Sequence, residues 1–121
     1  MIELLSRSNK ANFGIHASGK VTLEEELTFL GKLNSILEKH EKINILVLVE
    51  KNITWDTKAE LEDLKWIVQN FNRINKVALV SDAEIAEIFF KQIQPLFELA
   101  NINRAKFEAN KINEAWDWLE S

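Results

Sequence analysis

The 121-residue chain has no cysteine, only three glycines and a single proline. Without cysteine it forms no disulfide, no thiolate nucleophile and no sulfur-ligated metal site. With so few glycines it has no glycine-rich phosphate loop. Repeats, low-complexity tracts and linkers are also missing from the sequence. We therefore expect one domain spanning residues 1–121.

Basic residues are not concentrated anywhere in the sequence. The net charge is -4, and the lysines are scattered from Lys10 to Lys111. Nucleic-acid binding needs a concentrated positive surface, so this distribution argues against it. The first ten residues lack the basic start and long apolar run of a signal peptide, and no apolar run approaches the roughly 20 residues that span a bilayer. We expect a soluble cytoplasmic domain, with peripheral membrane association left open.

The apolar residues recur at spacings that predict strands alternating with helices. Residues 43–49 and 76–80 are apolar without alternation, which is typical of strands covered on both faces. The pattern predicts an α/β fold of order ββαβαβαβα, with a mixed, mostly parallel sheet and helices packed against it. The expected elements are a hairpin from 1–5 and 13–19, a helix from Val21 to about Lys39, a strand at 43–49, a second helix carrying 61–71, a strand at 76–80, a third helix at 83–93, a strand at 104–108 and a closing helix at 112–119.

Three stretches fit the capping box, in which a hydroxyl side chain bonds the amide three residues on and a glutamate there bonds back. They are Thr22–Glu25, Thr57–Glu60 and Ser81–Glu84. Each lies at the expected start of a helix, so we expect Thr22, Thr57 and Ser81 to be N-caps. The acidic runs at 24–26 and 60–63 most simply complement the dipoles of the first turns.

Several stretches match the core and turn residues of one family. They are the Trp55-Asp56 turn and residues 59–66, 71–82, 94–100 and 114–119. On these residues the chain resembles the SpoIIAA-like family of small bacterial proteins, within the STAS superfamily of sulfate-transporter and anti-sigma-factor-antagonist domains. The resemblance covers nearly the whole chain and implies a STAS-like fold. The family has no established biochemical activity, so the resemblance implies no particular function.

Asp56-Thr57 lies where anti-sigma-factor antagonists carry an Asp-Ser pair whose serine is phosphorylated. The resemblance therefore implies a possible phospho-acceptor region at Asp56 and Thr57. Here Lys58, Ala59 and Glu60 follow, without the glycine of the antagonist pattern. Thr57 also fits a helix cap, as Thr22 does, and threonine is a preferred N-cap residue. We favour the cap and keep a phosphorylation-gated partner switch as the alternative function.

No constellation of residues in the sequence indicates catalysis. His16 and His40 lack metal-ligand spacing, and the serines show no nucleophile elbow. We expect a protein that is not an enzyme, with no metal and no cofactor.

The aromatic residues carry the remaining signal. A helical projection places Leu64, Ile67, Val68 and Phe71 together and Trp66 nearly opposite them, so we expect Trp66 to face solvent. The third helix is apolar over an arc wider than a surface helix needs. Scattered exposed apolar residues are common, but a contiguous patch indicates an interaction site. We expect an apolar groove near the second and third helices, for an apolar or lipid-like ligand, a membrane surface or a second copy of the chain. Its residues would be Trp55, Trp66, Phe89, Phe90 and Phe97.

Overall fold

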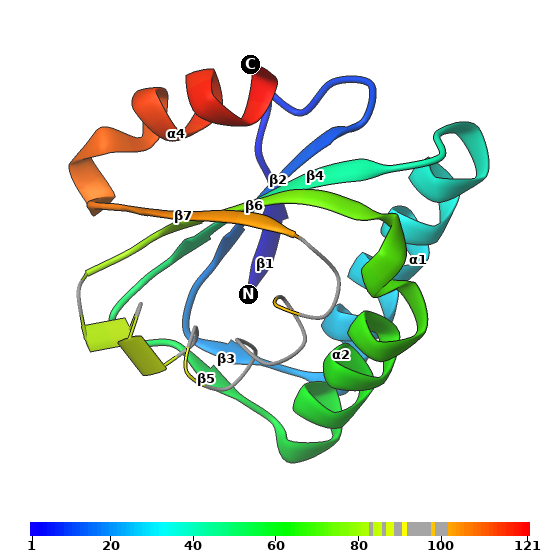
Figure 1. Ribbon diagram of the computed structural model, residues 1–121. Coiled ribbons are helices and arrows are strands. Elements are labelled where there is room, and N and C mark those ends of the chain that lie inside the picture. Colours follow the sequence, from blue (N-terminus) through cyan, green and yellow to red (C-terminus); the bar gives the residue numbers. More distant parts are fainter. Residues whose placement is uncertain (83, 86, 89–90, 92–97, 99–101) are drawn as a thin grey trace.

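The computed structural model describes residues 1–82, 84–85, 87–88, 91, 98 and 102–121, and these build a five-stranded sheet (Figure 1). The strand order is β1-β2-β4-β6-β7. β1 pairs antiparallel with β2, and the other neighbours are parallel, which confirms the predicted mixed, mostly parallel sheet. The strands are β1 (Ile2–Leu4), β2 (Asn12–Ala17), β4 (Ile43–Val49), β6 (Ile74–Val80) and β7 (Asn103–Phe107).

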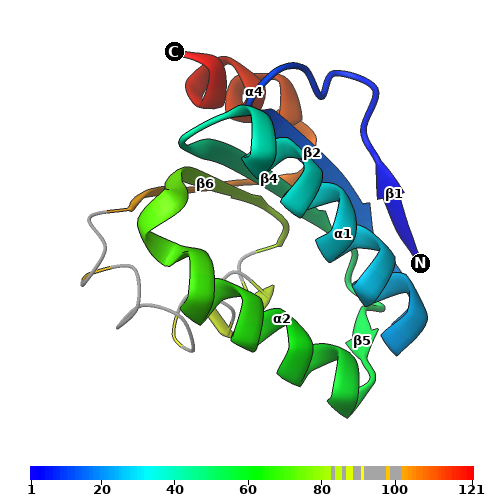
Figure 2. The ribbon, with the colours of Figure 1, turned by 90° about the vertical axis from the view of Figure 1, so that its right-hand side faces the viewer.

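Helices cover both faces of this sheet. α1 (Leu23–Lys39) and α2 (Thr57–Asn70) lie on one face and α4 (Ile112–Glu120) on the other, as Figures 1 and 2 show. Two short strands, β3 (Lys20–Val21) and β5 (Thr54–Trp55), form a separate parallel ribbon, and 3₁₀ turns span Phe71–Arg73 and Ala109–Lys111. The helix predicted at 83–93 lies largely outside the described residues.

The two central strands are buried on both faces, as their unbroken apolar sequences predicted. In β4, Ile45 packs toward α1 and α2, while Leu46 packs toward α4. In β6, Val77 and Ala78 divide in the same way. Because successive side chains of a strand point to opposite faces, one continuous apolar run serves two cores.

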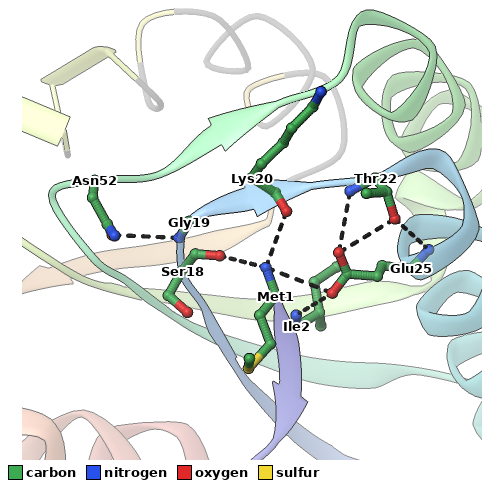
Figure 3. Close-up of polar contacts among 8 residues, drawn as sticks. All are labelled: Met1, Ile2, Ser18, Gly19, Lys20, Thr22, Glu25 and Asn52. Atoms are coloured by element: carbon green, nitrogen blue, oxygen red, sulfur yellow. Dashed lines mark hydrogen bonds and ion pairs between the residues drawn. The ribbon is translucent and has the colours of Figure 1, made fainter.

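The start of α1 confirms the first predicted capping box. Thr22 accepts a hydrogen bond from the Glu25 amide at 3.2 Å, and Glu25 Oε1 accepts from the Thr22 amide at 3.3 Å. The other oxygen of Glu25 accepts from the Ile2 amide at 3.0 Å and lies 3.5 Å from the Met1 amino group (Figure 3). One carboxylate therefore caps α1 and also fixes β1 beside it.

The other two predicted caps are wrong by one residue. α2 is capped by Asp56, whose Oδ1 accepts from the Lys58 amide at 3.3 Å, and Thr57 is the first helical residue. After β6, Asp82 rather than Ser81 accepts from the Ile85 amide, at 3.0 Å. In both places the aspartate beside the hydroxyl residue supplies the side-chain oxygen, and aspartate is at least as favourable an N-cap as serine or threonine.

α4 lies directly against β2 at Gly14. A Cβ added at Gly14 would lie 2.4 Å from two ring atoms of Trp116, so only glycine fits there. Trp116 is buried and Trp118 is only partly buried, so Trp116 is the indole of α4 that faces inward. This contact fixes the position of α4 on the sheet.

We predict that Gly14→Ala lowers the free energy of unfolding by about 1–3 kcal/mol, because the added methyl overpacks the contact with Trp116. Gly31→Ala is the control, since Gly31 lies within α1 with nothing near its added Cβ. Alanine is the better helix former, so the control should gain about 0.5–1 kcal/mol. Urea denaturation of both variants measures these changes. Equal stability of Gly14→Ala and the wild type would contradict the contact.

Candidate ligand-binding site

The β3–β5 ribbon brings the first turns of α1 and α2 together. Val21 pairs with Trp55, and each helix begins two residues after its member of this pair. The two helices then pack against each other along the same face of the sheet (Figure 2). Residues early in α1 therefore meet residues early in α2, although β4, β5 and the loops around them separate the two helices in the sequence.

A cavity of about 70 Å³ lies between these helices and the sheet. α1 contributes Phe29 and Leu33, and α2 contributes Trp66 and Ile67. Val47 of β4 and Val77 of β6 line it from the sheet. The wall is apolar except for Glu26 and Asp63, which lie beside Trp55.

Glu26 and Asp63 form a pair of acidic side chains inside the protein. Glu26 is only 1% exposed and Asp63 is partly buried. Their side chains hydrogen-bond to each other, so one carboxyl must carry a proton. Glu26 Oε1 is buried without a hydrogen-bond partner among the described residues. The cavity thus has one polar region in an otherwise apolar wall.

The pKa of Glu26 is raised to about 9, chiefly by burial and also by the hydrogen bond to Asp63 and the charge of Asp63, whereas the hydrogen bond to Trp55 acts to lower it. Burial also raises the pKa of Asp63, the hydrogen bond from Glu26 opposes that rise, and the charge of Glu60 adds to it. Two carboxylates this close cannot both ionise at little cost. Glu26 therefore holds the proton and donates a hydrogen bond to the carboxylate of Asp63.

Trp66 closes the cavity from the α2 side. It is 6% exposed, and its indole N–H donates to Asn34 Oδ1 of α1 at 2.8 Å. A buried indole needs such an acceptor for its N–H, and Asn34 satisfies it. The contact also ties α2 to α1 at the end of the cavity opposite the β3–β5 ribbon.

A family model described as SpoIIAA-like matches residues 13–120. The chain belongs to the SpoIIAA-like family. Among solved structures it is similar to an uncharacterized protein from the DUF3478 family with a SpoIIAA-like fold, from Shewanella loihica PV-4. The TM-score is 0.68 at 22% identity, with 98% of this chain and 93% of that chain covered, so the likeness shows the fold alone. The comparison with curated proteins finds no match.

In this SpoIIAA-like chain, Trp55 and Trp66 both line the cavity, as two members of the proposed apolar groove. The cavity lies between α1, α2 and the sheet. The third helix, beside which the groove was also predicted, lies largely outside the described residues. Phe89, Phe90 and Phe97, the other residues predicted for the groove, lie outside the described residues.

The predicted orientation of α2 is wrong for Trp66, Leu64 and Val68, although Ile67 and Phe71 pack against the core as expected. Trp66 was expected to face solvent and is buried, whereas Leu64 and Val68 were expected inside and are 45% and 50% exposed. Leu61, on the same side, is 61% exposed. The helix instead turns Ala59, Asp63 and Trp66 inward, because there the large indole is buried with a hydrogen-bond partner and Asp63 reaches Glu26. We call Leu61, Leu64 and Val68 the α2 stripe.

Thr57 is exposed, and its hydroxyl does not cap the helix that it begins. The capping role that favoured a structural explanation belongs to Asp56. Phosphorylation of Thr57 remains a prediction of the sequence.

Two broader features can be stated for the described part of the SpoIIAA-like chain. None of its helices is long and apolar enough to cross a membrane. None of its groups of histidine, aspartate and glutamate side chains is arranged to hold a metal ion.

Glu26 and Asp63 were missed as site residues, because the acidic runs were interpreted as charges serving the helix dipoles. The sequence holds a signal that could have found Glu26. It shares a helical phase with Leu30, Leu33 and Leu37, all buried, whereas Leu27 is out of that phase and 49% exposed. An acidic residue in phase with an apolar stripe indicates a buried carboxyl that must be protonated or paired.

We predict that Glu26→Gln flattens the dependence of stability on pH. The folded state keeps a proton on Glu26 up to about pH 9, whereas the unfolded state releases it near the ordinary value of 4.5. The wild type therefore loses stability as pH rises through this window, by at most about 1.4 kcal/mol per pH unit for one proton. Glutamine carries no such proton, so the stability of the variant relative to the wild type increases as pH rises.

Urea denaturation at pH 5.5, 7.0 and 8.5 tests this. Glu24→Gln is the control, because Glu24 lies in the same first turn and is exposed. Parallel slopes for the wild type and Glu26→Gln would show that Glu26 is ionised in the folded protein.

Proposed function

We propose that this SpoIIAA-like protein is a non-catalytic binding domain that holds a small apolar molecule in the cavity between α1, α2 and the sheet. The observation that carries the proposal is the cavity itself, apolar on most of its wall and interrupted by one polar pair. Ligand sites are usually concave and mostly apolar, with a few polar groups that orient the ligand.

The size of the cavity limits what it holds. Its volume is about 70 Å³, roughly half of the 150 Å³ at which an engineered apolar cavity admits benzene. By that measure it accommodates about three non-hydrogen atoms, half of the six in benzene. A short alkyl group fits, whether it is a whole molecule or the end of a longer one.

The test uses n-propanol as a neutral probe, because its three carbons match this volume and its hydroxyl can lie at the polar pair. The indole N–H signals of Trp55 and Trp66, which line the cavity, should shift in ¹⁵N-labelled protein. The signals of Trp116 and Trp118, packed on the other face of the sheet, should not move. Val47→Ile adds a methyl group to the cavity wall and should weaken binding several-fold, whereas Val68→Ile, on the exposed side of α2, should not. Equal shifts at all four indoles, or none, would contradict the proposal.

A second candidate function, docking to an anionic membrane surface, is favoured by the α2 stripe. Leu61, Leu64 and Val68 are 61%, 45% and 50% exposed and recur at helical spacing on one side. Lys58 and Lys65 are exposed on the same helix and would contact lipid headgroups. An amphipathic face of this kind binds a membrane interface through buried apolar area and basic charge. A second copy of the chain could cover the same apolar stripe instead of a membrane.

We predict that replacing Leu61, Leu64 and Val68 together by glutamine abolishes sedimentation with anionic vesicles. Stability should stay within about 0.5 kcal/mol per substitution, because these side chains are already 45–61% exposed. Leu27→Gln, an exposed leucine on α1, is the control and should still bind. Analytical ultracentrifugation without vesicles shows whether the stripe instead joins two copies of the chain in a dimer. Vesicle binding that survives in the triple variant would exclude the stripe as the membrane contact.

The alternative retained from the sequence is a phosphorylation-gated partner switch at Thr57. Support comes from its exposed position at a helix N-terminus, where a phosphate is electrostatically favoured. Intact-mass measurement on protein isolated from its host would detect the phosphate, and its absence there under all growth conditions would count against the switch.

A further inference from the structure

The polar region of the cavity has a chemistry of its own. Glu26 is 1% exposed and lines the cavity, and its Oε1 has no hydrogen-bond partner among the described residues. A buried acceptor left in this way costs free energy until a donor reaches it. The group that satisfies Oε1 must therefore donate a hydrogen bond.

The pair also carries a negative charge. Glu26 holds the one proton of the pair, so Asp63 remains the carboxylate that accepts the hydrogen bond from Glu26. Within the described residues, the charged groups that act on the pair are themselves acidic, namely Asp63 on Glu26 and Glu60 on Asp63. Lys65, on the same helix as Asp63, forms an ion pair with Glu62 at 3.6 Å. The described part of the chain therefore supplies this buried charge with no cation.

We propose that the cavity binds a small primary amine in its protonated form, with the ammonium group against Glu26 and Asp63 and a short alkyl body among the apolar side chains. The ammonium would donate one hydrogen bond to Glu26 Oε1 and supply the positive charge that the pair lacks. An alcohol donates a hydrogen bond but brings no charge, and a carboxylic acid would add a third acidic group. This inference rests on the proposed function and adds the chemical class of the ligand.

The test compares n-propylamine with n-propanol at pH 7, which differ only in the polar group. Titrations are followed on the indole N–H signals of Trp55 and Trp66, with Trp116 and Trp118 as internal controls. A hydrogen bond to a charged group is stronger than one between neutral groups, so the amine should bind at least about ten-fold tighter.

Three variants assign the preference to the pair. Asp63→Asn removes the charge and should reduce the ratio of amine to alcohol affinity towards one. Glu26→Gln keeps an acceptor oxygen and the charge of Asp63, so it should retain the preference. Glu62→Gln is the control, because Glu62 is a neighbouring acid that pairs with Lys65 and not with Glu26 or Asp63. This variant should show the same preference as the wild type.

Equal affinity for the two probes in the wild type would overturn the inference while leaving the cavity as an apolar site. A preference unchanged in Asp63→Asn would also overturn it. If neither probe shifts Trp55 or Trp66, the proposed function fails as well. Should Asp63→Asn not fold, as judged from the Trp116 and Trp118 signals, the wild-type ratio decides alone.

Discussion

The hydrogen bond between the carboxyls of Glu26 and Asp63 determines how α1 and α2 face each other. A charged carboxylate is costly to bury, and a protonated partner reduces that cost. For the two side chains to meet, α2 must turn Asp63 inward, and Trp66 follows because it lies one turn further along the same face. Its hydrogen bond to Asn34 then fixes the helix pair at a second point. The cavity lies between these two contacts.

The strands and the order of elements could be predicted because they depend on local patterns. The unbroken apolar runs of β4 and β6 announce burial on both faces, and Trp116 follows the apolar phase of the closing helix. Caps were predictable only to within a residue at Asp56 and Asp82. An aspartate and a hydroxyl residue stood side by side there, and side-chain geometry alone decided between them.

The orientation of α2 could not be predicted from apolar periodicity. Leu61, Leu64 and Val68 define a clear stripe, yet the helix buries the opposite side. Periodicity counts apolar residues and gives no weight to an indole with a partner or to a carboxyl pair. Both partners, Asn34 and Glu26, lie on α1, and their approach depends on the β3–β5 ribbon. This constraint comes from tertiary structure, so the sequence of α2 alone does not contain it.

The two proposed sites are consequences of this one orientation. Fully burying an apolar side chain such as leucine or valine gains about 1.5–3 kcal/mol, so leaving three of them half exposed forgoes roughly 1 kcal/mol each. The contacts of Asp63 and Trp66 must outweigh that loss. α2 exposes apolar side chains to solvent and buries an acidic one, which departs from the usual pattern of a surface helix. Such departures tend to mark functional surfaces. Asp63 belongs to the proposed cavity site, and the α2 stripe is the proposed membrane contact on the opposite side of the helix. Losing the carboxyl pair would therefore alter both surfaces of α2 together.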